Sequence, residues 1–535
     1  MTVALAPDER PRSVVVRDRA VRVAPIVLPV LLALVLGVRR LLLPHVLFGM
    51  SAYDEDDAIY LGAAVRLVHG SLPYRDFVFL QPPGITVIMA PLAALGSLVG
   101  LAPALVVARL LVLVVTAANA GLAASLLRPR GRAAAVLAGG AVAAFPFSAE
   151  ADVSLKLEPF VVLGTLLGSQ LVLRALRRPD HGLGSGRLLV GGAILGLTVT
   201  VKLWALFPLA GLLLACLPHA RVLLRRVVPA VAVGTLVPVL PFLVASPRQF
   251  VYDIFLVQAQ RAAGTIDALT TPQRLDGMTG IRSLQGPPLH PLAGSMTLLV
   301  LTLATLLVIA LTRGQLMREE WFLIGAVPVT VGALLIPSEF YPYYAYQPGV
   351  YVALLAVAVL ARTAGGLRIA LMRLGQAGSG RGAQRGAFLV GLAVIALAVH
   401  QQVKADDAYL AGAYDDSDVV AAIVPIGSCV VFDQPDRVLL ANRFTSARSG
   451  CPPVTDPYGS YLAADPADPP PRQKLPPPAA YVEQWRGYFD ASDFVVLGVP
   501  FSSYLPWTSE LEAYFTARFQ LVYNTSRTYV YVHAR

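Results

Sequence analysis

The chain has 535 residues, of which 56% are hydrophobic and only 14% are charged, and its formal net charge is +10. Soluble proteins carry about 25% charged residues, so this composition excludes a water-soluble globular protein and favours one with a lipid-facing surface. Arginines in short cytoplasmic loops explain the positive charge, because no soluble basic face that would bind nucleic acid is visible.

The first 22 residues are basic and precede the first apolar run, a pattern typical of an uncleaved signal anchor. Further apolar runs recur up to residue 402, and a full membrane crossing needs about 20 such residues. We therefore expect an all-α polytopic protein of the cell membrane with about 11 or 12 hydrophobic segments. The predicted regions are a cytoplasmic N-terminus (1–22), a transmembrane domain (23–402) and a small extracytoplasmic α/β domain (403–535).

Arginine clusters set the predicted orientation, since positively charged loops stay on the cytoplasmic side of a membrane. They lie at residues 128–132, 174–178, 221–226, 313–318 and 362–385. The connections between them then face outward, at 148–158, around Lys202, at 246–290, at 338–346 and after 402. Crossings at both 84–101 and 103–127 would place the first cluster outside, so either one of these runs does not cross the membrane or the charge rule fails here. We expect 84–101, with its internal glycines and proline, to be the run that does not cross.

An acidic run follows the first apolar segment directly and consists of Asp54, Glu55, Asp56 and Asp57. Like charges this close raise each other's pKa unless a cation or a donor hydrogen relieves them. A carboxylate here is suited to act as a general base or as a hard oxygen ligand for a metal. The alternative is a solvated acidic loop with no function of its own.

The second outward loop carries Asp152, Lys156 and Glu158, and Lys202 lies between two later apolar runs. Glu158 would begin a helix, where the helix dipole favours an anion, and this is also its structural explanation. A charge such as Lys202 inside an apolar stretch is costly. It indicates either a cation for a phosphate group or a side chain that reaches to the membrane interface.

Residues 403–535 are richer in polar residues, prolines and aromatics. We expect a proline-rich loop at 466–478, strands at 429–433, 494–498 and 529–533, and helices at 481–489 and 509–519. Cys429 and Cys451 both fall in this region. If the region is exported they can form a disulfide, and the alternative is two free thiols.

Several short motifs occur in a fixed order along the chain: the acidic run, Gly70-x-x-Pro73-Tyr74-x-Asp76, Pro82-Pro83-Gly84, Glu158-Pro159, and Lys202 at the end of a Gly-Leu-Thr run. In this order they resemble the GT-C glycosyltransferase superfamily, in particular the branch of bacterial lipid A aminoarabinose transferases and protein O-mannosyltransferases. The resemblance covers residues 23 to about 360. It implies a GT-C-like catalytic domain that moves a sugar, with inversion, from a polyprenyl-phosphate donor to an extracytoplasmic acceptor, namely a cell-envelope glycan, lipid or protein.

The resemblance also implies roles for individual residues. Asp54 would be the base that deprotonates the acceptor hydroxyl, with Glu55 as its neighbour in the motif, and Glu158 would orient acceptor or donor. Lys202 would neutralise the lipid phosphate as it leaves, with Arg75 and Arg261 as further phosphate ligands. Additional site candidates are Asp57, Asp76, Asp152, Tyr74 and Gln81.

One departure from the pattern concerns the donor site. Aminoarabinose transferases place an acidic-Lys pair just before Pro-Pro, whereas this chain has Leu80-Gln81 there, so one expected phosphate cation is missing. The resemblance does not require a metal. A divalent cation stays an option, although no histidine cluster supports zinc.

Two other functions compete with this interpretation. A transporter or flippase would be expected to have ionisable residues in the middle of its spans and inverted repeats. A non-catalytic membrane protein whose outer domain binds the envelope would explain residues 403–535, but it would leave the acidic run without a purpose.

Overall fold

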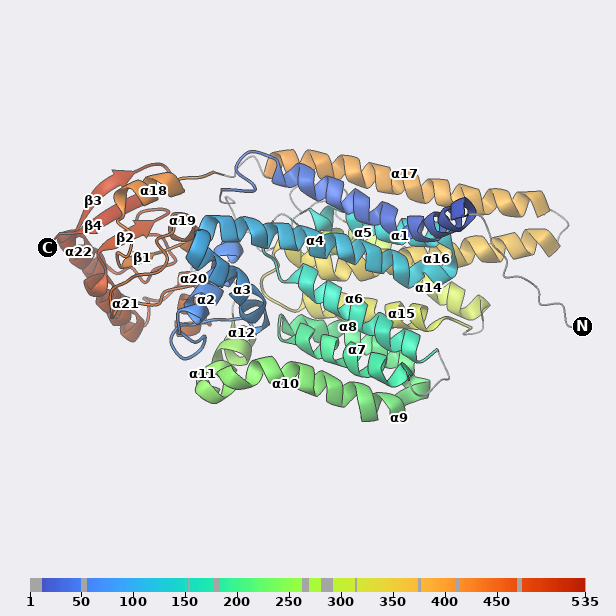
Figure 1. Ribbon diagram of the computed structural model, residues 1–535, viewed down its shortest axis with the longest axis horizontal. Helices are drawn as coiled ribbons and strands as arrows, with labels where there is room; N and C mark the ends of the chain where they lie inside the picture. Colours follow the sequence, from blue (N-terminus) through green and yellow to red (C-terminus); the bar gives the residue numbers. More distant parts are fainter. Residues whose placement is uncertain are drawn as a thin grey trace, which may run out of the picture.

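The computed structural model describes residues 12–49, 55–149, 151–152, 154–177, 183–261, 269–280, 292–312, 315–373, 377–409, 414–468 and 474–534. Long helices form a bundle, and the C-terminal sheet packs at one end of it (Figure 1). The bundle helices are α1 (Arg12–Leu41), α2 (Asp56–Val68), α3 (Gly84–Val99), α4 (Leu101–Leu127), α5 (Arg132–Ala144), α6 (Glu158–Ala175), α7 (Leu183–Val199), α8 (Leu206–Cys216), α9 (Ala220–Val222), α10 (Val228–Ala245), α11 (Pro247–Val251), α12 (Val257–Gln260), α13 (Thr271–Thr279), α14 (Ala293–Leu311), α15 (Arg318–Leu335), α16 (Tyr346–Arg373) and α17 (Ala377–Tyr409).

The length and hydropathy of its helices identify the chain as a membrane protein. Within the described residues, 6 helical stretches are long and apolar enough to cross a membrane, and three shorter apolar helices accompany them. The long stretches are Val23–Leu41, Leu101–Arg130, Leu203–Ala245, Ala293–Leu311, Pro342–Ile369 and Gly382–Lys404. The sequence predicts more segments, because it counts short apolar runs that the fold uses as partial helices or joins into one continuous stretch.

Helix α3 is one of these shorter helices. It has 16 residues, fewer than the roughly 20 of a full crossing, and it ends at Gly100, where a φ of 97° suits glycine. Helix α4 then continues for 27 residues. Helix α3 lies beside α2 at the end of the bundle near the sheet (Figure 1), and whether 84–101 crosses the membrane stays a prediction.

The C-terminal part is a four-stranded sheet with the order β1-β2-β4-β3. Strands β1 (Val430–Phe432) and β2 (Phe494–Leu497) are parallel, and β4 (Tyr529–His533) is antiparallel to β2 and to β3 (Phe519–Asn524). Its helices are α18 (Ser417–Ile423), α19 (Pro435–Leu440), α20 (Pro457–Ala464), α21 (Ala479–Ala491) and α22 (Ser509–Arg518). The predicted α/β character of this part is confirmed.

Strand β3 escaped prediction because it is an edge strand whose residues after Phe519 are mostly exposed, so it lacks an apolar alternation. Cys429 and Cys451 form a disulfide that ties the start of β1 to the segment before α20. Helix α19 packs on α2 and α4, and thereby joins the sheet to the bundle.

The ends of the bundle differ in their charged residues. Helix α6 begins at Glu158, near the sheet, and its 18 residues extend about 27 Å toward the other end. At that far end Arg130 and Arg362 both pair with Glu320, at 2.5 and 2.9 Å, and Arg177 pairs with Glu319. These ion pairs join α15 to the ends of α4 and α6 and to the interior of α16.

Candidate active site

Two adjoining cavities lie where the bundle meets the C-terminal part. The first has a volume of about 600 Å³ and the second about 240 Å³. They share five lining residues, namely Leu80, Gln81, Gln258, Arg261 and Tyr344. A molecule that filled both would therefore pass the loop before α3, helix α12 and the short helix η7 (Pro342–Ala345).

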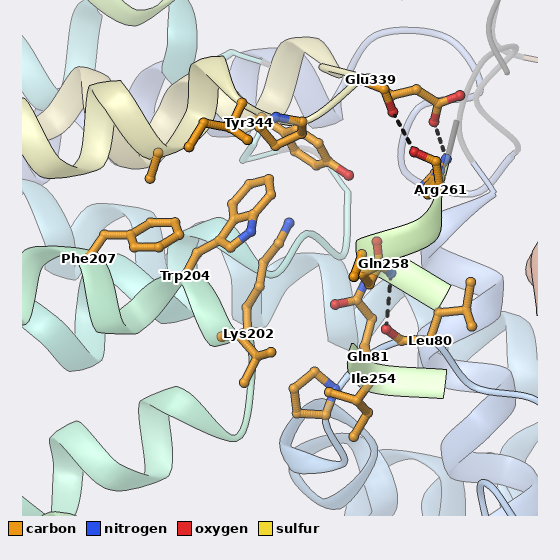
Figure 2. Close-up of a pocket in the computed structure, with 17 residues that line it drawn as sticks. Leu80, Gln81, Lys202, Trp204, Phe207, Ile254, Gln258, Arg261, Glu339 and Tyr344 are labelled. Carbon is orange, nitrogen blue, oxygen red and sulfur yellow. Dashed lines mark hydrogen bonds and ion pairs between the residues drawn. The ribbon is translucent and has the colours of Figure 1, made fainter. Parts of the chain in front are cut away.

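The first cavity combines apolar walls with one buried lysine. Lys202 points into it between Trp204 and Gln258 (Figure 2). Its ammonium lies 2.5 Å from the Glu158 carboxylate and stacks over the rings of Trp204, at 3.7 Å, and Tyr344, at 4.2 Å. The lysine lies just after α7, separated from it by Thr200 and Val201, and its own extended backbone leads into the short helix η3 (Leu203–Ala205). Its charge is therefore held at one fixed point of the wall.

Arg261 supplies a second cation at the boundary between the two cavities. It pairs with Glu339, lies 3.5 Å from the hydroxyl of Tyr341 and packs over the ring of Tyr458. Burial tends to lower the pKa of its guanidinium, but the surrounding tyrosine and glutamate oxygens outweigh burial and raise it. Arg261 thus keeps its positive charge within reach of both cavities.

The second cavity is acidic. Glu55, Asp56 and Asp456 line it together with Tyr504. Asp56 is held at 2.9 Å by Lys156, whose ammonium also lies 3.7 Å from the centre of the Tyr343 ring. Asp456 caps α20 by accepting a hydrogen bond from the backbone N–H of Gly459. The bundle and the C-terminal part therefore each contribute a carboxylate to one volume.

Glu55 precedes α2, and its carboxylate accepts a hydrogen bond from the side-chain amide of Gln434, which comes from the C-terminal part. Removal from bulk water, followed by the charges of Asp436, Asp433 and Asp456, raises the pKa of Glu55 well above its ordinary value. A carboxylate with a raised pKa takes up a proton more readily. The environment of Glu55 therefore suits a general base.

Asp456 has a related environment. Burial is the main cause that raises its pKa, to about 6, and the charge of Asp56 adds to the effect. The backbone hydrogen bond from Gly459 and the charge of Arg261 act in the opposite direction. The sequence contains no motif around Asp456 that would have indicated a site, because its neighbours in space are about 400 positions away in the chain.

The structure separates the other predicted residues into different places. Asp54 lies outside the described residues. Glu158 lines none of the three cavities described in this article, and it is the buried partner of Lys202. Gln81 lines both cavities.

Arg75 and Asp76 are not near Lys202 or Arg261. They pair with each other at 2.7 Å and line a third cavity. The reason is local, since Tyr74 adopts a φ of 66° and donates its hydroxyl to the backbone carbonyl of Gln81 at 2.5 Å. This turn places the two charged residues at the third cavity, and neither of them lines the first two. A role of Arg75 at the donor phosphate stays a prediction.

Two of the additional candidates are structural. Asp57 forms a buried ion pair with Arg109 of α4 at 2.7 Å and accepts a hydrogen bond from the backbone of Leu155. Asp152 pairs with the fully buried Arg40, which also pairs with Asp406 at the end of α17. Asp57 and Asp152 are each paired with an arginine of another helix, and neither residue lines a described cavity.

The acidic cavity was also a candidate metal site. Among the described residues, no group of three or more His, Cys, Asp or Glu side chains is arranged to hold a metal ion. Asp56 is already bound to Lys156, and Asp456 accepts a backbone N–H. Asp56 and Asp456 are thus engaged with other partners among the described residues, and a divalent cation stays a prediction.

The sequence and the fold were compared with those of known proteins. No family model and no curated protein matches the sequence. Among solved structures, ArnT from Cupriavidus metallidurans superposes with a TM-score of 0.59, both in the apo state and bound to undecaprenyl phosphate. The identities are 15% and 16%, and the match covers 95% of this chain and 97% or 98% of the ArnT chain.

A second similar structure is the oligosaccharyltransferase of Archaeoglobus fulgidus tethered with an acceptor peptide. It has a TM-score of 0.54 and 12% identity, and covers 96% of this chain and 74% of its own. The chain has the GT-C fold. The resemblance inferred from the motifs is thereby confirmed for the fold. In the GT-C fold of this chain, both cavities lie at the end of the bundle that contacts the C-terminal part.

Proposed function

We propose that the chain is an inverting glycosyltransferase that moves a sugar from a polyprenyl-phosphate donor to an acceptor on the outer side of the membrane. The observation that carries the proposal is the junction of the two cavities. One has apolar walls and two cations, and the other has three carboxylates, with five lining residues in common. A lipid-borne phosphate and an acceptor hydroxyl would need these opposite environments side by side.

The first cavity fits the donor. Its walls include Trp204, Phe207 and Ile254, which suit an isoprenoid chain. Ile336, also in its wall, is 83% exposed, so the rim continues into the apolar outer surface of the bundle. A lipid tail could lie there while its phosphate meets Lys202. One solved ArnT structure contains undecaprenyl phosphate, and an Archaeoglobus fulgidus oligosaccharyltransferase structure contains a dolichol-phosphate.

The second cavity fits the acceptor and the base. In the proposed reaction Glu55 takes the proton from an acceptor hydroxyl, and the hydroxyl oxygen attacks the anomeric carbon of the donor sugar. The bond from that carbon to the phosphate oxygen breaks on the opposite face, and polyprenyl phosphate leaves. Asp54, outside the described residues, is the other candidate for the base.

Lys202 and Arg261 act on the leaving group. Negative charge grows on the phosphate as the bond breaks, and fixed cations in a water-poor cavity stabilise that charge more than bulk water does. Glu158 is a positioning residue in this proposal, because it holds the Lys202 ammonium without lining the cavity. The positive-inside distribution of arginines supports an outward-facing site.

The test starts with the lipid. Purified protein should carry polyprenyl phosphate that mass spectrometry detects, and added undecaprenyl phosphate should raise its melting temperature. In proteoliposomes the protein should transfer labelled sugar from a panel of polyprenyl-phosphate sugars. If no polyprenyl phosphate copurifies or stabilises the protein, and no donor in the panel is consumed, the proposal is wrong.

A further inference from the structure

A third cavity of about 440 Å³ lies outside the two that the proposed reaction uses. It is enclosed by the turn around Tyr74, the start of α11, and helices α20 and α21 of the C-terminal part. Three aromatic residues of α21 line it, namely Tyr481, Trp485 and Tyr488, together with Gln484. Tyr481 and Trp485 are only 5% and 1% exposed, so the half-buried Tyr488 and the exposed Gln484 are the accessible part of this wall. The cavity is therefore aromatic on one side and polar at its rim.

The charges of this cavity cancel. Arg75 and Asp76 face each other with two hydrogen bonds, of 2.9 and 2.7 Å, and the pairing lowers the pKa of Asp76. Arg75 and Asp76 therefore bring no net charge to the cavity, and no further charged side chain among the described residues lines it. Aromatic rings with amide, hydroxyl and paired charged groups instead suit a neutral molecule with apolar C–H faces and many hydroxyls, which is the chemistry of a sugar.

The third cavity shares two walls with the acidic cavity. The first wall is helix α20, where Ser460 and Ala463 line the third cavity while Gly459 and Leu462 line the acidic one. A ligand on one side of α20 is thus separated from the other side by a single helix. An extended molecule could pass around its end and occupy both cavities.

The second wall is the loop from Tyr74 to Gln81. Tyr74 lines the third cavity and donates to the carbonyl of Gln81, which lines the other two. A parallel connection starts at Gln249, whose amide donates at 2.7 Å to buried Asp253, and Asp253 accepts the backbone N–H of Phe79. Groups that touch a ligand in the third cavity are therefore bonded to the wall of the reaction site.

We propose that the third cavity binds a neutral sugar unit of the acceptor, beyond the unit that receives the transferred sugar. The acceptor would then be a glycan chain, held at two points on either side of α20. The identification of this sugar unit as part of the acceptor rests on the proposed function. The binding of a neutral oligosaccharide to the cavity does not depend on it.

The experiment measures binding of the full-length protein in nanodiscs to short arabinan, galactan, mannan and glucan oligosaccharides, each with a phosphorylated counterpart. Ala464→Trp fills the cavity from an exposed position, and it should weaken binding, with a dissociation constant at least about tenfold higher. Gln484→Ala removes hydrogen bonds and should raise the dissociation constant about three- to tenfold. Glu483→Ala, an exposed neighbour on α21 outside the cavity, is the matched control and should change binding less than about twofold.

The outcomes separate the two proposals. Lys202→Met should leave oligosaccharide binding intact, because Lys202 lines only the first cavity, while loss of undecaprenyl-phosphate binding in the same variant reports on the donor site alone. The inference is overturned if no oligosaccharide in the panel binds. It is also overturned if binding survives in a folded Ala464→Trp variant, or if the phosphorylated forms bind best. Oligosaccharide binding without any donor turnover would instead reject the proposed function and keep this cavity as a sugar site.

Discussion

The two ends of the helical bundle use the same chemistry for different purposes. At the end far from the sheet, Arg130, Arg362 and Arg177 neutralise Glu320 and Glu319, and none of these residues lines a described cavity. At the end near the sheet, the pairs Lys202–Glu158, Lys156–Asp56 and Arg261–Glu339 each place at least one charged group against an open volume.

The difference indicates how a charged residue with a role in binding or catalysis can be distinguished from a structural one in a membrane protein. A buried ion pair by itself contributes little net stability, since the loss of hydration offsets the attraction. At the end near the sheet, each ion pair has a cavity beside it. A charged substrate can enter this cavity and either replace one member of the pair or bind alongside it. The following predictions test whether this contrast divides function from structure, in order of decreasing effect on activity.

Glu55→Gln should lower kcat by about a thousandfold, because it removes the proposed base while keeping an oxygen that can accept from Gln434. Turnover of labelled donor in proteoliposomes is the measurement. The matched control is Asp57→Asn in the same acidic run, which should reduce thermal stability more than kcat, because Asp57 pairs with Arg109. Full activity in Glu55→Gln, with loss of activity in Asp54→Asn, would assign the base to Asp54 instead.

Lys202→Met should lower kcat about a hundredfold by removing the cation that faces the leaving phosphate. The double variant Lys202→Met, Glu158→Leu decides whether the pair is only structural. Replacing both partners of a buried pair with apolar groups restores stability, so the double variant should regain its melting temperature but not its turnover. Recovery of turnover in that variant would contradict a role for Lys202 in chemistry. Arg177→Met, at the other end, should leave kcat within about twofold of the unchanged protein.

The pH dependence should reflect the raised pKa of Glu55. A base must be deprotonated to act, so kcat/KM should fall as pH drops through that raised pKa, at a higher pH than the ordinary value of about 4.3 would give. Asp456→Asn removes one like charge and keeps an oxygen for Gly459. It should move this acid limb to lower pH, by less than about one unit, because desolvation is the larger cause. A limb that moves upward would be inconsistent with this electrostatic coupling.

Glu320→Gln should have the smallest effect on activity and a large effect on stability. It weakens the contacts of the buried Glu320 with the half-buried Arg130 and Arg362, and losing charge-assisted hydrogen bonds of this kind costs on the order of 2 kcal/mol. Thermal unfolding in detergent measures the loss, and turnover per folded molecule should stay near that of the unchanged protein. A large fall in turnover per folded molecule would mean that the far end also takes part in the reaction.

The sequence anticipated part of the candidate site. Lys202 could be identified because a charge is conspicuous in an apolar run, and Glu55 because it belongs to an acidic run. Arg75 lines the third cavity, because the motif gave its order in the chain but not the turn at Tyr74, and its role at the donor phosphate stays a prediction. The pairing of Glu158 with Lys202 brings together side chains that the sequence treats as separate motifs.

Sequence by itself determined that this is a membrane protein with a small polar α/β part at its C-terminus, because hydropathy and alternation are summed over neighbouring residues. Only the tertiary structure decided which carboxylates face an open volume. Asp57 and Asp152 are closed off by arginines of other helices, whereas Glu55 meets Asp456 across some 400 positions of chain. Burial and pairing depend on such distant neighbours, and they fix both the charge of a side chain and what it can reach.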